Sequence, residues 1–389
     1  MWLLEQVISA LRFGVRFAFF VLVTPVTVAA LGAVPAGCSA STSTSGPSDG
    51  TDGGVATGDG GSSGDGASPG TDGGTGTKDG GAGSDASAGT LPPMTTAVKI
   101  IVEPTDRAAA LISAIQAATT SVHMTMYLLS NSSIINALIA QKSAGHEVKV
   151  LLNKTFPGGQ GSNTSSYNQL LGAGVNVQWA PAGFTLTHEK CLIIDAATAW
   201  IMTMNATQTS PIDNREYLAV DTDPSDVAEA EAIFAADFAN QAVSANGKLV
   251  VAPDNARGKL VALVAAAKTT VDMEAEELSD ASLVAAMAAA SDRGIKVRVV
   301  IATGAGSPSQ QQGIALLKQH GVKLVSVSTP YMHAKSIVVD GAYAYVGSEN
   351  FSTGSLQYNR ELGVLTNAAA EVAKVASTTA SDFASGSPL

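Results

Sequence analysis

Two histidine–lysine pairs offer the clearest chemistry in the sequence. His188 and Lys190 form the first pair and His333 and Lys335 the second, with the histidines 145 positions apart (188 to 333). Residues two apart on an extended strand point to the same side. Two imidazoles and two ammonium groups in one cavity suit a phosphodiester, because the ammoniums neutralise its non-bridging oxygens. One imidazole can attack phosphorus while the other protonates the leaving alcohol, and this chemistry calls for no metal and no cofactor.

The two segments continue to agree beyond the histidine and the lysine. Each pair is followed, at the same offsets and without a gap, by an aspartate, a hydroxyl residue, an asparagine and an Arg-Glu dipeptide. The matching residues are Asp195 and Asp340, Thr203 and Ser348, Asn205 and Asn350, and Glu216 and Glu361. One His-x-Lys pattern is a weak signal, but two in register with these partners predict a shared chemical role.

Each motif is predicted to lie on a buried strand that ends in a tight turn. The residues between the lysine and the aspartate are apolar, and Asp340-Gly341 is a favoured hairpin pair. Helices and short strands precede both motifs in the same order, which indicates an internal repeat. The alternation predicts an α/β fold with two mostly parallel sheets flanked by helices. We expect the active site at the interface of the two repeats.

The pattern His-x-Lys-x-x-x-x-Asp, followed by Gly-Ser-x-Asn, resembles the signature of the phospholipase D superfamily, which includes cardiolipin synthases. The second copy matches it in full with Gly347, Ser348 and Asn350, whereas the first copy has Met202 and Thr203 where the family has Gly and Ser. The resemblance covers the chain from about Thr96 to its last residue. It implies a duplicated phospholipase D-like fold and phosphodiesterase activity.

The resemblance also implies a role for each matching residue. One histidine becomes a covalent phosphohistidine, and the other acts as an acid and then as a base. We favour His188 as the nucleophile and His333 as the acid, and the reverse assignment stays open. The residues expected to hold the phosphate are Lys190, Lys335, Asn205, Asn350 and Ser348, with Thr203 keeping a hydroxyl in the first copy. Glu216 and Glu361 are expected to orient the imidazoles, and Asp195 and Asp340 to organise their turns. Because one chain carries both motifs, a monomer is sufficient for the site.

The first 95 residues predict export and attachment to a membrane. Residues 1–38 combine a charged start, an apolar stretch and small residues before Cys38, as in a bacterial lipoprotein signal peptide. Acylation of Cys38 would tie the protein to the cell envelope, and an uncleaved anchor helix is the alternative. Residues 39–95 are rich in Gly, Ser, Thr and Asp and predict a disordered tether. The two repeats then span residues 96–245 and 246–389.

The charge of the chain bears on its substrate. Its net charge is -11, and it has no basic block of the kind that nucleic-acid-binding proteins usually carry. Together with the predicted membrane anchor, this favours a phospholipid, so the leading hypothesis is hydrolysis or transfer of phosphatidyl groups in the cell envelope. An envelope or extracellular nuclease of the same superfamily is one alternative. A catalytically inactive surface binding module is the other.

The remaining polar residues of note receive structural interpretations. Glu274, Glu276, Glu277 and Asp280 lie near the end of a predicted strand and are interpreted as a solvated face rather than a metal site. If they faced the cavity, they would disfavour polyanionic substrates. Cys191 is interpreted as a small strand residue.

Overall fold

The computed structural model describes residues 90–157, 161–245, 247–304 and 306–389. The predicted signal peptide, Cys38 and most of the predicted tether lie outside the described residues. Within the described ranges, no helix is both long and apolar enough to span a membrane. Leu91 and Met94 pack against the core of the second repeat, and Thr95 pairs with Thr366, so the packed chain begins a few residues before Thr96.

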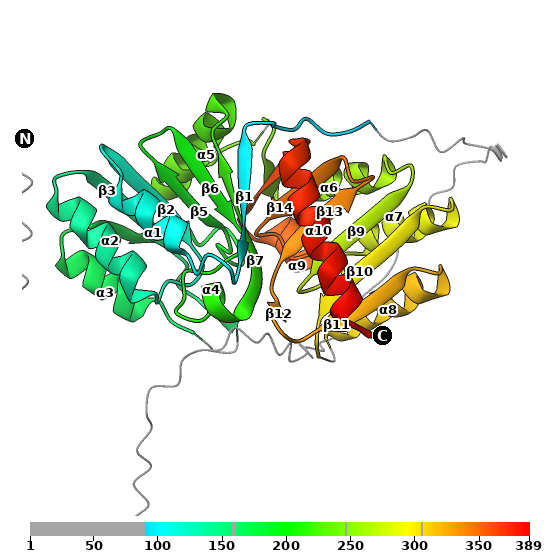
Figure 1. Ribbon diagram of the computed structural model, residues 1–389. Coiled ribbons are helices and arrows are strands. Elements are labelled where there is room, and N and C mark those ends of the chain that lie inside the picture. The colour runs from blue at the N-terminus through cyan, green and yellow to red at the C-terminus, as the bar shows by residue number, and fades with distance from the viewer. Residues whose placement is uncertain (1–89, 158–160, 246, 305) are drawn as a thin grey trace, which may run out of the picture. The chain divides into compact units, whose positions relative to one another are not determined.

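Each repeat builds its own sheet, and the strand order of the second sheet, taken in reverse, repeats that of the first with one further strand at its edge (Figure 1). In spatial order the first contains β1 (Val98–Glu103), β7 (Asn214–Asp221), β6 (Thr198–Met202), β5 (Lys190–Ile194), β2 (Ser121–Met126), β3 (Glu147–Leu152) and β4 (Asn176–Trp179), with β12 (Tyr331–Met332) paired to β7. The second contains β16 (Ser387–Pro388), β11 (Lys323–Val327), β10 (Lys296–Ala302), β9 (Thr270–Ala275), β13 (Lys335–Val339), β14 (Tyr343–Gly347), β15 (Glu361–Thr366) and β8 (Val250–Ala252). The predicted duplication is confirmed.

The strand directions correct one expectation, because both sheets are mixed rather than mostly parallel. Along the two strand orders, β2–β3–β4 and β9–β10–β11 run parallel and the other neighbours are antiparallel. The short β12 pairs with β7 in parallel. The motif turns account for one antiparallel pair in each sheet, β5–β6 and β13–β14. Asp195 and Asp340 adopt left-handed backbone conformations with φ of 54° and 55°, and each folds its motif strand back as a hairpin. The predicted α/β fold class is confirmed.

Helices cover the outer face of each sheet, and two more lie between the sheets. The outer helices are α1 (Ala109–Gln116), α2 (Ser132–Ser143) and α3 (Thr164–Gly172) on the first sheet, and α6 (Ala256–Ala265), α7 (Ala281–Asp292) and α8 (Pro308–Gln319) on the second. The inner helices are α5 (Pro224–Phe238) and α10 (Ala369–Ser385), and the short α4 (Ser210–Asp213) and α9 (Thr353–Tyr358) precede β7 and β15. Asn131 and Asp280 cap α2 and α7, because each side chain accepts two backbone N–H bonds at the start of its helix.

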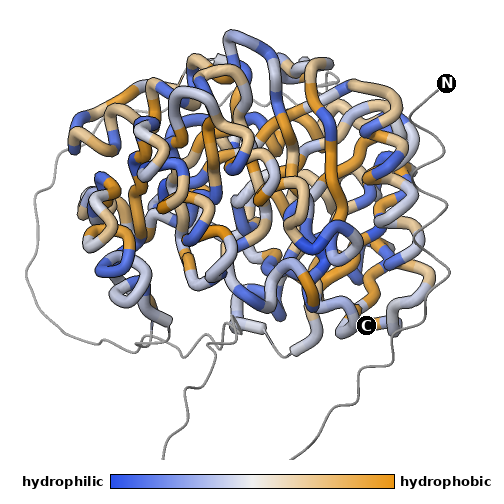
Figure 2. The backbone as a smooth tube through the Cα atoms, turned by 60° about the vertical axis from the view of Figure 1, so that its left-hand side comes forward, coloured by the Kyte–Doolittle hydropathy of each residue, from blue (hydrophilic) through white to orange (hydrophobic). Residues whose placement is uncertain are grey.

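The two repeats share a core, which fixes the position of one motif relative to the other. This core contains Ile193 of β5 and Val338 of β13, together with Phe234 of α5 and Val375 of α10. Figure 2 shows the hydrophobic stretches along the interior strands. Burying this apolar surface favours docking of the two sheets and brings strands from distant parts of the chain together. The two motif strands are therefore held by a packed interior.

Candidate active site

Backbone pairing places each motif histidine beside the glutamate of the other repeat. Met332 of β12 pairs with Arg215 of β7, and Thr187 pairs with Arg360 in an isolated bridge. Both pairings are parallel, so the next residues along the two strands are also neighbours. His333 thus meets Glu216, and His188 meets Glu361.

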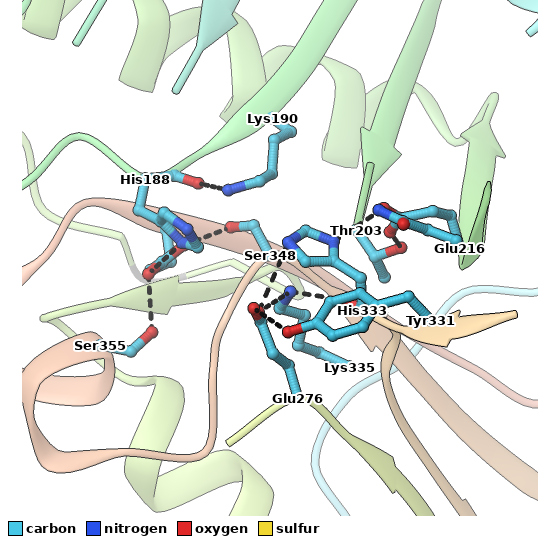
Figure 3. Close-up of polar contacts among 12 residues, drawn as sticks. His188, Lys190, Thr203, Glu216, Glu276, Tyr331, His333, Lys335, Ser348 and Ser355 are labelled. Carbon is cyan, nitrogen blue, oxygen red and sulfur yellow. Dashed lines mark hydrogen bonds and ion pairs between the residues drawn. The ribbon is translucent and has the colours of Figure 1, made fainter. Parts of the chain in front are cut away.

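The side chains complete these crossed pairs. Nδ1 of His188 lies 3.0 Å from both carboxylate oxygens of Glu361, and Nδ1 of His333 lies 2.7 Å from Oε1 of Glu216. All four side chains are buried, and Figure 3 shows that both repeats contribute to one site. With Nδ1 engaged by a carboxylate, Nε2 is the nitrogen of each imidazole that is oriented for chemistry. Neither half of the chain builds a complete site alone.

Hydroxyl and amide groups fix the two glutamates. Ser348 and Ser355 donate to Glu361 over 2.7 and 2.6 Å, and Asn359 donates over 3.2 Å. In the first repeat, Thr203 donates to Glu216 over 2.5 Å and Asn214 over 3.1 Å. Ser348 and Thr203, which the sequence grouped with the phosphate-binding residues, therefore support the glutamates that hold the histidines.

The replacement of Gly by Met202 changes the packing behind the site. Met202 is buried opposite Leu218, whereas the equivalent Gly347 lies opposite Gly363. A Cβ atom on Gly347 would stand 2.6 Å from Cα of Gly363, so this pair of strands needs glycine. The first repeat replaces both glycines with larger residues and still keeps the Thr203–Glu216 contact.

Both motif lysines are buried and held by their own histidines. Nζ of Lys190 donates to the carbonyl of His188 over 2.6 Å, and Nζ of Lys335 donates to the carbonyl of His333 over 2.7 Å. Asn205 is fully buried and Asn350 half-buried, and the side-chain oxygen of each is buried. Buried ammonium and amide groups of this kind are suited to a phosphate anion.

The motif aspartates lie away from the histidines. Asp195 and Asp340 follow the far ends of β5 and β13, about 16 Å along the strand from the motif lysines at about 3.3 Å per residue. The carboxylate of Asp195 accepts backbone N–H bonds from Thr119, Thr120 and Ser121, and Asp340 accepts the equivalent bonds from residues 268–270. Both aspartates thus organise turns in the structure.

The electrostatics of His188 suit a nucleophile. Burial lowers the pKa of His188, the carboxylate of Glu361 opposes this, and the ammonium of Lys190 adds to the lowering, so that the pKa lies below its ordinary value. Burial alone would raise the pKa of Glu361, but His188 and Lys190 bring that pKa below its ordinary value. At neutral pH the pair is thus a neutral imidazole that donates Nδ1–H to a carboxylate, with a lone pair on Nε2.

The acidic residues of the second repeat were wrongly interpreted as a solvated face. Glu274 and Asp280 are fully buried, and Glu276 and Glu277 are half-buried. Oε2 of Glu276 lies 2.8 Å from Nζ of Lys335. The sequence analysis also omitted Tyr127, whose ring packs edge-on against His188 with the centroids 4.4 Å apart. Asn214 and Asn359 were missed too, although an Asn-Arg-Glu tripeptide at matching positions of the two copies could have revealed both.

The crossed pairs make a testable prediction. Glu361→Gln and Glu216→Gln preserve shape but remove the charge that supports an imidazolium and fixes the tautomer of the histidine. Each change should lower kcat/KM for a phosphodiester by about 10²-fold or more. Glu231→Gln is the matched control, because Glu231 pairs with His123 outside the site. Equal activity of all three variants would show that the crossed carboxylates do not support the histidines.

Two other buried carboxyls predict a pH dependence of stability. Burial raises the pKa of Glu189 and of Glu274 to about 8, so both stay protonated in the folded protein at neutral pH. In the unfolded chain both carboxyl groups have the ordinary pKa of 4.5 and therefore lose their protons above that pH. Stability should therefore fall between pH 4.5 and about 8, by about 1 kcal/mol per pH unit for each group. Unfolding midpoints across this range should fall less steeply in Glu189→Gln than in the wild type or in the exposed control Asp213→Asn, and equal slopes would contradict the prediction.

The comparisons with known proteins agree with this geometry. The family model described as "Cardiolipin synthase, PLD-like domain" matches residues 111–238 and 260–384, which is more than half of the chain. No curated protein matches the chain.

Two solved structures show the same fold at low sequence identity. Phosphatidylserine synthase from Haemophilus influenzae Rd KW20 matches with a TM-score of 0.56 and 10% identity, over 78% of this chain and 90% of that one. Polyphosphate kinase from Porphyromonas gingivalis matches with a TM-score of 0.57 and 15% identity over 73% of this chain, which spans only 46% of the kinase. The phospholipase D family member Nuc from Salmonella typhimurium matches 36% of this chain over 95% of its own length, at 23% identity and a TM-score of 0.35.

The family model covers both repeats, and the predicted resemblance is confirmed. With one copy of the domain in each half, the chain belongs to the phospholipase D-like family of the cardiolipin synthase type.

Proposed function

We propose that this protein hydrolyses or transfers phosphatidyl groups by the phospholipase D reaction, through a phosphohistidine intermediate, in the cell envelope. The observation that carries the proposal is the crossed pairing of two buried histidines with two buried glutamates, beside two buried lysines. That arrangement supplies a nucleophile, a proton donor and two cations at one site.

The proposed reaction has two steps. Nε2 of His188 attacks phosphorus, so that an N–P bond forms as the bond to the leaving oxygen breaks. His333 gives its Nε2 proton to the leaving alcohol, and Lys190 and Lys335 neutralise the non-bridging oxygens. Water then attacks the phosphohistidine, His333 takes up the proton of that water, and the N–P bond breaks to restore His188. An alcohol in place of water gives transfer instead of hydrolysis.

The choice of a lipid substrate rests on the first 95 residues and on the low content of basic residues. An acylated Cys38 and a tether would hold the site close to a bilayer. Lys and Arg number 22 in the chain against 33 Asp and Glu, which does not favour binding to a polyphosphate backbone.

The test compares two substrates in one experiment. Head-group release from vesicles of mixed phospholipids is measured beside nicking of plasmid DNA, with EDTA present and with the His188→Ala, His333→Ala double variant as control. Lipid turnover that the double variant loses is the expected result. DNA cleavage without lipid turnover would assign the protein to the nucleases, and inactivity on both substrates would favour a binding module.

A further inference from the structure

One position differs between the two halves of the site in a way that changes its charge. Lys190 pairs with Met126 across strands β5 and β2, and Lys335 pairs with Ala275 across β13 and β9. The next residues, Tyr127 and Glu276, therefore occupy equivalent places beside the two motif lysines. The first half has a neutral ring at this place, and the second half has a carboxylate.

Both residues contact the motif pair of their own repeat. The ring of Tyr127 packs against His188 and lies under Nζ of Lys190, 4.8 Å from the ring centroid. Oε2 of Glu276 lies 2.8 Å from Nζ of Lys335 and 3.4 Å from Nε2 of His333. Figure 3 shows the Glu276 carboxylate in contact with the side chains of both His333 and Lys335. The oxygen of Glu276 thus stands where a non-bridging oxygen of a bound phosphate would be expected.

The contact with Glu276 changes what Lys335 can offer a substrate. Oε2 of Glu276 neutralises the ammonium of Lys335 and lies close to Nε2 of His333, so a phosphate bound beside these two groups has a carboxylate next to it. A phosphodiester brings one negative charge to this place. A phosphomonoester brings a second negative charge, which would face Glu276.

We propose that Glu276 is a specificity-determining residue, which restricts the site to phosphodiesters that carry a single negative charge and disfavours phosphomonoesters and polyanions. The proposal rests on the proposed function, because it concerns the same phosphate position. It also favours release of the hydrolysis product, since a diester is converted to a monoester that Glu276 repels. A carboxylate near two phosphate charges is unfavourable because like charges at short range in a partly buried site are poorly screened.

Binding of two small probes tests the proposal without any need for turnover. Dimethyl phosphate has one negative charge, whereas methyl phosphate is almost a dianion at mildly alkaline pH, since its second pKa is about 6. Titration calorimetry would give both dissociation constants for the wild type and for Glu276→Gln. The ratio of the methyl phosphate constant to the dimethyl phosphate constant should fall by about tenfold or more in the variant, because the repulsion has been removed. An unchanged ratio would overturn the proposal.

Two further variants sharpen the test. Glu231→Gln removes a carboxylate that pairs with His123 outside the site, and it should change the ratio less than about twofold. Glu276→Tyr copies the residue of the first repeat and should lower the ratio as Glu276→Gln does. Either variant is sufficient for the test if the other one folds poorly. Absence of phosphodiester turnover by the wild type would count against the proposed function. An unchanged ratio of the two dissociation constants in the Glu276 variants would count against the role of Glu276 alone.

Discussion

Alanine in place of either His188 or His333 is expected to reduce the turnover of phosphodiesters by about 10⁴-fold or more, because nucleophile and acid act as one unit. The two variants should differ in a way that assigns their roles. With a p-nitrophenyl diester, whose leaving group needs no proton, His333→Ala should still release one equivalent of nitrophenol and then stop. His188→Ala should release none, because no N–P bond can form.

The matched control for these variants is His320→Ala. His320 pairs with Asp292 at the surface and lies outside the site, so its replacement should leave turnover unchanged. A burst in His188→Ala and none in His333→Ala would reverse the assignment of the two histidines. Activity retained by both variants would show that the reaction does not use them.

Arg360→Ala is expected to destabilise the folded protein by about 3–5 kcal/mol, since it leaves a buried carboxylate without its cation. Nε of Arg360 donates to Oδ2 of Asp237 over 2.8 Å, and both side chains are only 3% exposed. Arg360 also donates to the carbonyl of Ala252. This pair links the residue before β15 to helix α5 of the first repeat, so its loss should loosen the contact between the repeats.

Thermal unfolding of single and double variants measures this effect. Asp237→Leu with Arg360→Met removes both charges and should be more stable than either single change, because no unpaired ion remains. Arg215→Ala is the natural comparison, since Arg215 pairs with Asp382 at the equivalent place in a less buried setting, with side chains 13% and 6% exposed. If Arg360→Ala unfolds at the same temperature as the wild type, the buried pair contributes nothing to stability.

The repeat and the motif chemistry could be predicted from the sequence because identical spacing preserves identical geometry. His188 and His333 are equivalent, and so are Glu216 and Glu361, so any fold that pairs the repeats must treat them alike. The spacing could not show that each glutamate serves the histidine of the other repeat. That depends on the pairing of β12 with β7, which joins residues far apart in the chain.

The strand directions and the role of Glu276 could not be predicted from the sequence, for different reasons. Alternation of strands and helices suggests parallel strands, but the turns at Asp195 and Asp340 impose antiparallel neighbours. For Glu276, an acidic residue at a strand end is usually solvated, and only the packed sheet shows that it points at Lys335. The sequence did contain one indication, because the first repeat has Tyr127 at the position where the second repeat has Glu276. A ring in one repeat and a carboxylate in the other indicate that the two halves of the site differ in function.

Trapping the covalent intermediate tests the two-histidine mechanism directly. The purified protein would be mixed with a labelled phosphodiester, quenched in denaturing alkali, where phosphohistidine survives, and digested for mapping by mass spectrometry. We expect a phosphoryl adduct on the peptide that contains His188, and no such adduct in His188→Ala. Turnover without an adduct on either motif histidine, or an adduct on a residue outside the two motifs, would contradict the two-histidine mechanism.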